Sequence, residues 1–208
     1  MRARKVLSLA ALALTAQVMA SGCLLFPELK DKIVELATTG TVTADFHAQG
    51  IVNTYTEIKT INIRDSVDIA KVLTDAGIDV ADVKKITVGG VAYRITVADP
   101  TTGRQITNGS ITVQRQGGLA ADLVTNLTAN ADAVTGWITP TLDPAGVTEL
   151  NNLLADILTE LQGGAAANEV ITYTVSGNSV PVDVSSDFKY QLRLTISVVG
   201  TVKVKTLE

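Results

Sequence analysis

Cysteine is almost absent from this chain of 208 residues, which contains one Cys, one His and one Trp. A single cysteine excludes a disulfide framework and any metal site that is built from several thiolates. Aromatic residues are also scarce, at one Trp, four Tyr and three Phe. The core must therefore consist mainly of aliphatic side chains, and few rings remain to line a ligand pocket.

Sequence motifs for catalysis are lacking as well. A Ser-His-Asp site would need His47, which lies at a polar position of an expected strand with no serine placed near it. No Gly-x-Ser-x-Gly elbow, P-loop or dinucleotide-binding glycine motif occurs. Ser186 and Lys189 match Ser-x-x-Lys, but that motif needs a helix and here it opens a strand. We therefore predict no enzymatic activity, no cofactor and no metal site.

The most regular pattern in the chain is residues 188–204, where apolar and polar side chains alternate. A strand points successive side chains to opposite faces, so this segment predicts one apolar face and one wet, basic face. At about 3.3 Å per residue it is far longer than an ordinary strand, and we expect a break at Gly200. The apolar positions are Phe188, Tyr190, Leu192, Leu194, Ile196, Val198, Val202 and Val204.

Shorter segments with the same alternation occur throughout the chain after residue 39. They are residues 40–48, 51–64, 86–98, 110–115, 169–176 and 180–184. In the third of these segments, the apolar parity switches at Gly89-Gly90, which predicts a bulge or bend. Together they predict a mainly β protein, an antiparallel β-sandwich or a partly closed barrel.

Two regions change to a helical period of about 3.6 residues. A short helix is expected near 65–76, with Asp65 as its N-cap. A helical hairpin is expected as an insertion near 119–162, and its second helix, from Pro144 to Leu161, has the strongest apolar stripe in the chain. Its leucines need a surface to pack against, and an open end or face of the sandwich is the simplest one.

The N-terminus has the order of a secretory signal rather than of a folded element. Residues 1–5 are basic, residues 6–20 are apolar, and Ala20-Ser21-Gly22 precedes Cys23. This segment resembles the signal peptide and lipobox of bacterial lipoproteins, although Ala20 stands where the strongest lipoboxes have Leu. The resemblance covers residues 1–23 only. It implies that Cys23 is lipidated and that acyl chains hold the protein in the membrane of the cell envelope.

The resemblance also implies a domain organisation and a location. Residues 1–22 would be the signal peptide, residues 23–38 the lipidated cysteine and a tether, and residues 39–208 a single β-sandwich domain with the helical insertion. In lipoproteins of the enteric type, an Asp after the lipidated Cys favours the inner membrane. Leu24 stands there in this chain, so the outer membrane is expected.

Removal of residues 1–22 takes away Arg2, Arg4 and Lys5. The remaining chain has 14 basic and 21 acidic residues, a net charge of −7. An acidic surface opposes binding to nucleic acid, which needs basic side chains to displace counterions. We therefore expect no nucleic-acid partner.

Two functions remain in view for the domain. The first is a structural or protein-interaction module of the envelope, and the alternative is a carrier of a lipid or another apolar ligand. The candidate surface for a ligand or partner comprises Trp137, Leu150, Leu154 and Leu158. Trp137 is expected either to cover apolar surface as a lid or to make an exposed contact.

Overall fold

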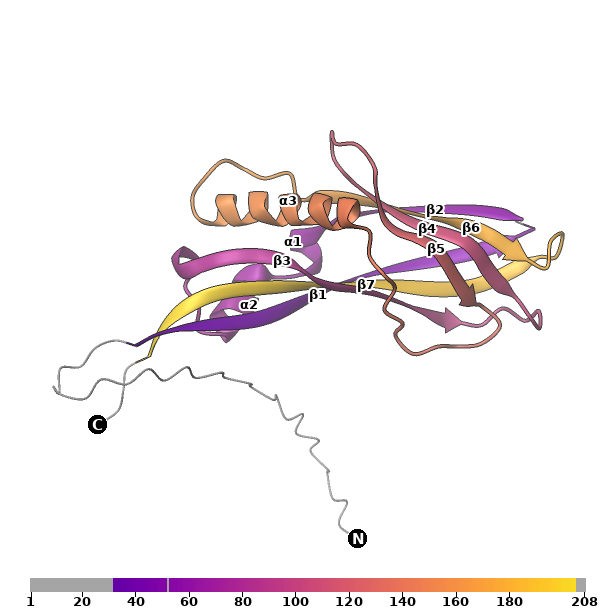
Figure 1. Ribbon diagram of the computed structural model, residues 1–208, viewed down its shortest axis with the longest axis horizontal. Helices are drawn as coiled ribbons and strands as arrows, with labels where there is room; N and C mark the ends of the chain where they lie inside the picture. Colours follow the sequence, from indigo (N-terminus) through magenta and orange to yellow (C-terminus); the bar gives the residue numbers. More distant parts are fainter. Residues whose placement is uncertain (1–31, 52, 205–208) are drawn as a thin grey trace, which may run out of the picture.

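A computed structural model describes residues 32–51 and 53–204, and their architecture is a two-layer antiparallel β-sandwich (Figure 1). Sheet A has the strand order β1-β7-β3, and sheet B has the order β2-β6-β4-β5. The sheets are separate, so the sandwich describes the fold and the partly closed barrel does not. The strands are β1 (Lys32–Gly50), β2 (Thr54–Asn62), β3 (Val83–Val97), β4 (Gln105–Arg115), β5 (Ala121–Asn130), β6 (Val170–Val180) and β7 (Ser186–Val204).

The central strand of sheet A is β7, and its alternating pattern is confirmed. Its even-numbered side chains from Phe188 to Val198 are buried, while the odd-numbered ones are exposed or half-buried. The expected break at Gly200 is wrong, because β7 pairs with β1 without interruption from Lys32↔Val204 to Gly50↔Ser186. A Cβ on Gly200 would lie 2.6 Å from the Ile78 Cγ2. The glycine therefore allows a neighbouring segment to approach the strand.

The inner face of sheet A has two covers, because its long strands extend past the shorter sheet B. β1 and β7 have 19 residues each, whereas the strands of sheet B have 9 to 11. Sheet B covers one half. The other half is covered by α1 (Ile63–Ser66), α2 (Ile69–Asp75), the 3-10 turn η1 (Val80–Asp82) and α3 (Pro144–Leu161) (Figure 1). No helix in the described ranges is long and apolar enough to cross a bilayer.

The short helix expected near 65–76 is present as two pieces. Asn62 caps α1 by accepting hydrogen bonds from the backbone N–H groups of Arg64 and Asp65. Asp68 caps α2 by accepting one from Lys71. Asp65, the expected N-cap, therefore lies inside the first turn of α1, and extended Val67 separates the two helices.

The helical hairpin expected near 119–162 is half wrong, because residues 121–130 form strand β5. Irregular pairing with β4 buries the adjacent Leu123 and Val124 and then Leu127. Asn126, between them, has a φ of 56°. Buried positions at i, i+1 and i+4 imitate a helical stripe, which explains the error. Only α3 of the hairpin is a helix, and Asp143 caps it.

The boundary expected for the tether also changes. β1 begins at Lys32, so residues 32–38 belong to sheet A, and the domain starts before residue 39. Apolar and polar residues do not alternate strictly over residues 32–38, so the sequence pattern did not predict this part of the strand. The expected irregularity at Gly89-Gly90 is confirmed by a register shift between Val88 and Gly90. The predicted signal peptide and Cys23 lie outside the described residues.

The one-sided character of sheet A predicts opposite responses to the same charge. Leu192 is 5% exposed on the inner face of β7, and Leu192→Asp should destabilise the fold by several kcal/mol because it buries a carboxylate without a partner. Thr195→Asp introduces the same charge on the outer face and should cost far less. Urea unfolding followed by circular dichroism measures both, and equal losses would contradict the one-sided sheet.

Candidate functional site

The leucines expected to form a ligand or partner surface belong to the core. Leu150 and Leu154 are each 1% exposed, and Leu158 is half-buried against the same cluster. The helix that carries them contacts β3, β4 and β5. Leu153 is equally buried and was not among the predicted surface residues, although its position three residues after Leu150 fits the apolar stripe. These side chains act in packing.

Close contact between α3 and sheet B depends on Gly146 in the first turn of the helix. A Cβ at this position would lie 2.5 Å from the Asp122 backbone oxygen and 2.6 Å from the Leu123 Cα. The missing side chain therefore lets the helix backbone approach β5, which brings the leucines into the core.

The space between the two sheets is filled by side chains. A cavity of about 10 Å³ lies there, lined by Val42, Ala44, Ile61, Val91, Tyr173, Leu192 and Leu194. Sites for small molecules usually enclose about 300–1,000 Å³, and a single water needs roughly 10–15 Å³. This cavity can hold one water at most.

Trp137 lies apart from the leucines, on the outer face of sheet A. The segment after β5 runs along the free edge of β3, where Ile138 exchanges two backbone hydrogen bonds of 2.9 and 2.8 Å with Tyr93. The indole ring of the half-buried Trp137 packs against two guanidinium groups, 4.5 Å from the Arg94 Cζ and 4.3 Å from the Arg193 Cζ. The expected lid over apolar surface is therefore wrong.

A chain of polar side chains crosses this outer face from strand to strand. Arg94 Nε donates to Gln191 Oε1 at 2.9 Å, and Gln191 Nε2 donates to Asp45 Oδ1 at 2.8 Å. Further along the face, His47 Nε2 lies 2.8 Å from Asp187 Oδ1. These contacts join β3, β7 and β1 across the wet face predicted from the sequence.

The two weak catalytic candidates do not form a catalytic arrangement. His47 is 40% exposed and its described hydrogen-bond partner is Asp187, with no serine hydroxyl bonded to it in the described part of the chain. Ser186 is buried and bonds to Ser179 Oγ at 3.0 Å, whereas Lys189 is exposed on the opposite face of β7. Over residues 32–51 and 53–204, no group of three His, Cys, Asp or Glu side chains could hold a metal ion.

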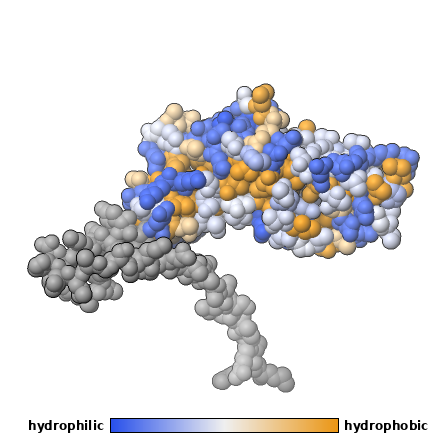
Figure 2. All heavy atoms as spheres, viewed as in Figure 1, coloured by the Kyte–Doolittle hydropathy of each residue, from blue (hydrophilic) through white to orange (hydrophobic). Residues whose placement is uncertain are grey.

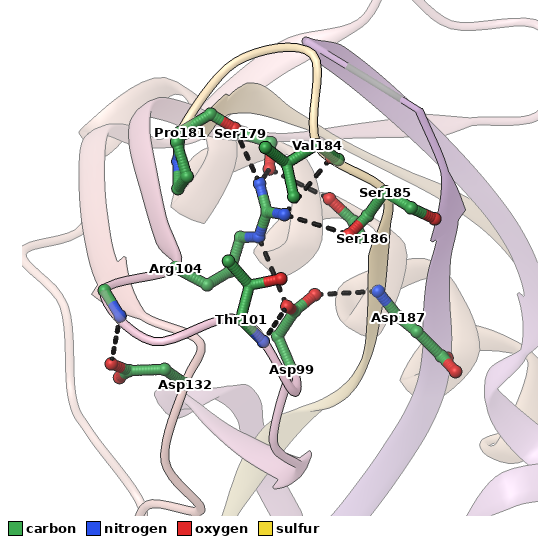
Figure 3. A network of polar contacts seen from close by, with 11 residues as sticks. Asp99, Thr101, Arg104, Asp132, Ser179, Pro181, Val184, Ser185, Ser186 and Asp187 are labelled. Atoms are coloured by element: carbon green, nitrogen blue, oxygen red, sulfur yellow. Dashed lines mark hydrogen bonds and ion pairs between the residues drawn. The ribbon is translucent and has the colours of Figure 1, made fainter.

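Among residues 32–51 and 53–204, the largest fully buried side chain is that of Arg104, at the end of the sandwich far from the described termini (Figures 1 and 3). Its Nη1 donates to Ser179 Oγ at 2.9 Å and to the Pro181 carbonyl at 2.8 Å. Its Nη2 donates to the carbonyls of Val184 at 3.2 Å and Ser185 at 2.9 Å. Arg104 thus ties the loop between β3 and β4 to the loop between β6 and β7.

Asp99 balances the charge of this buried arginine. Its Oδ1 lies 3.4 Å from Arg104 Nε and accepts a hydrogen bond from the Thr101 N–H, while its Oδ2 accepts one from the Asp187 N–H. Burial alone raises the pKa of the Asp99 carboxyl, but these hydrogen bonds and the arginine outweigh it, so the pKa lies below its ordinary value. Asp99 is therefore ionised at neutral pH. No pattern in the sequence predicts this pair, because strand periodicity does not identify a buried arginine in a turn.

Exposed apolar side chains surround the same end of the sandwich. Ile51, Val180, Val182 and Val184 are 71%, 40%, 58% and 38% exposed. Orange residues reach the surface at this end in Figure 2. Asn53, between β1 and β2, and Asp183, between β6 and β7, join their two loops by hydrogen bonds of 2.7 Å each. One runs from Asn53 Nδ2 to Asp183 Oδ1, and the other from the Asp183 N–H to Asn53 Oδ1. We call these four apolar residues the apolar tip.

Comparisons with known proteins define no family for this chain. Neither the protein-family models nor the curated proteins give a match. Among solved structures, the chain is similar to one from Desmodium yellow mottle tymovirus, with 10% identity, a TM-score of 0.36 and full coverage of both chains. It is also similar to one from turnip yellow mosaic virus, with 9% identity, a TM-score of 0.32, and coverage of 81% of this chain and 98% of that one. The class that the coordinates define is an antiparallel β-sandwich.

The Arg104 network predicts a large loss of stability when one charge is removed. Arg104→Met leaves the Asp99 carboxylate buried without its counter-ion and should cost about 3–5 kcal/mol. Arg115→Met is the matched control, because Arg115 makes partly exposed ion pairs with Glu149 and Asp156 and should cost about 1 kcal/mol or less. Chemical denaturation measures both losses, and similar values would contradict a special role for Arg104.

The same network predicts a pH dependence of stability. Because the folded-state pKa of Asp99 is depressed, its contribution is fully present above about pH 4 and is lost as pH falls through the folded-state pKa. Asp99→Asn should therefore weaken the protein at pH 7 and flatten the acid limb of its stability profile. Thermal unfolding between pH 2 and 7, with Asp132→Asn as the control, measures this. An unchanged acid limb would show that Asp99 does not carry it.

A substitution in the packed face of α3 can distinguish a filled protein interior from a ligand-binding site. Leu154→Ala should cost about 2–5 kcal/mol, because it removes buried methylene groups and leaves a cavity. Denaturation midpoints of wild type and variant, each before and after delipidating extraction, measure this. If extraction lowers wild-type stability markedly and releases a lipid in near-stoichiometric amount, the protein is a carrier.

Proposed function

We propose that the protein is a bacterial lipoprotein of the cell envelope, most simply of the outer membrane, whose β-sandwich acts as a structural or protein-interaction module. The observation that carries the proposal is the N-terminal order of basic, apolar and small residues that ends at Cys23, the one cysteine of the chain. The proposal includes no enzymatic activity, and it includes no nucleic-acid partner because the chain is acidic.

The filled interior supports an interaction module over a carrier. The side chains of α3 that a carrier would need to move aside are 0–1% exposed within the core, as for Leu150, Leu153, Leu154 and Ile157. The cavity between the sheets has about 10 Å³, far below the volume of an acyl chain. Binding would then use the surface of the domain.

The arrangement of the strands supports a module that reaches away from its anchor. Nine residue steps separate Cys23 from Lys32, where β1 begins, and a chain of that length spans at most about 30 Å. β1 then runs 19 residues, roughly 60 Å, to the apolar tip. Exposed apolar side chains held by hydrogen-bonded loops at the far end are a suitable contact for another protein.

The test of the anchor is the chemistry of the N-terminus. In a bacterial host, mass spectrometry should find the mature chain beginning at an acylated Cys23, and the protein should sediment with membranes. Cys23→Ser should abolish acylation and release the protein from the membrane fraction. Ser21→Ala keeps a small residue before the cysteine and should leave both unchanged. A mature N-terminus elsewhere, or membrane attachment that survives Cys23→Ser, would sink the proposal.

A further inference from the structure

The described part of the chain contains five arginines, and they divide sharply by their partners. Arg64, Arg104 and Arg115 each form ion pairs with carboxylates. Arg94 and Arg193 have no carboxylate within 4.0 Å among residues 32–51 and 53–204, although acidic residues outnumber basic ones in the whole chain by 21 to 17. These two arginines are the ones that pack against Trp137.

Sheet register places both guanidinium groups on the outer face. Arg94 pairs with Gln191, and Arg193 pairs with Ala92, so the two arginines are diagonal neighbours on β3 and β7. Each Cζ lies within 4.5 Å of the Trp137 ring centroid, so the two Cζ atoms are less than 9 Å apart. Two like charges at this separation repel each other, and the ring offsets only part of that repulsion.

The hydrogen-bonding capacity of the pair is largely unused. Arg94 Nε donates a hydrogen bond to Gln191, whereas Arg193 Nε is buried and has no hydrogen-bond partner among the described residues. Backbone hydrogen bonds hold the segment that carries Trp137 against β3, because Ile138 pairs with Tyr93 and the Thr135 N–H donates to the Ile95 carbonyl at 3.2 Å. The cluster is therefore an aromatic ring with two half-buried guanidinium groups beside it on the outer face of sheet A.

We propose that Arg94, Trp137 and Arg193 form the docking site for the carboxylates of an acidic segment of a partner protein. Guanidinium groups bind carboxylates through paired N–H donors, which makes these interactions strong and directional. Trp and Arg also carry much of the binding energy in protein interfaces. The inference deepens the proposed interaction role and rests on it.

The chain provides its own reporter, since Trp137 is its one tryptophan. The full chain in a non-aromatic detergent is titrated with hexaglutamate, and tryptophan emission should change in a saturable manner. Fluorescence anisotropy of labelled hexaglutamate gives the affinity, which should fall at least tenfold in Arg94→Gln/Arg193→Gln. The matched control Lys59→Gln/Lys71→Gln removes two charges from exposed sites off sheet A and should bind as wild type does. Circular dichroism verifies that both variants are folded.

Several outcomes would overturn the proposal. One is the absence of saturable binding, and another is an equal loss of affinity in the two double variants. Tighter binding of inorganic phosphate or of phosphatidylglycerol vesicles would assign the site to phosphate or lipid anions instead. Self-association that disappears only in the arginine variant would assign it to a second copy of the chain. Acylation at Cys23 does not enter these measurements, so the anchor and the docking site can fail separately.

Discussion

The buried pair of Arg104 and Asp99 is the interaction on which one whole end of the sandwich depends. Three connections pass between the sheets there: β1 to β2, β3 to β4, and β6 to β7. Arg104, in the β3–β4 loop, binds the β6–β7 loop from inside the sandwich. Asn53, in the β1–β2 connection, binds the same β6–β7 loop at the surface. Both terminal nitrogens of the buried guanidinium group depend on acceptors in one loop, and Asp99 balances its charge, so the network tolerates few loop geometries. That restriction gives the apolar tip a defined shape.

The opposite end is built by packing instead of polar contacts. The strands of sheet A extend beyond the shorter strands of sheet B, and the part of the inner face of sheet A that sheet B does not cover needs another apolar layer. Two short helices and α3 provide it, with Gly146 and Gly200 allowing close approach. The sandwich therefore combines an end ordered by a buried ion pair with an end ordered by aliphatic contacts, and a single core connects them.

The sequence predicted the features that depend on local periodicity. The alternation of residues 188–204 identified the central strand, and the stripe of residues 144–161 identified α3 with its Asp143 cap. It failed where local irregularity altered the period. The bulged pairing of β5 buries Leu123 beside Val124, and this spacing resembles a helix. The start of β1 at Lys32 was not predicted for a related reason, because its first residues do not alternate strictly between apolar and polar.

The candidate site was harder to predict, because its residues meet only through sheet register and loop placement. The sequence predicts that Trp137 joins Leu150, Leu154 and Leu158 in one surface, whereas Trp137 packs against Arg94 and Arg193 and the leucines pack in the core. Arg94 and Arg193 lie 99 residues apart in sequence and become neighbours only because β3 pairs with β7. No sequence pattern predicts the burial of Arg104, since the carbonyls that accept its hydrogen bonds belong to a loop distant in sequence.

The pairing of β1 with β7 has a mechanical consequence. The two strands are antiparallel along 19 residue pairs, and β1 leads directly from the N-terminal side of the domain to the apolar tip. A pull between the proposed membrane anchor and a proposed partner at the tip would act along β1. Ladder hydrogen bonds lie perpendicular to the strands, so such a force shears them together and does not open them one after another. In this geometry the hydrogen bonds between β1 and β7 would share the load along the length of sheet A, and many of them would have to break at once for the strands to separate.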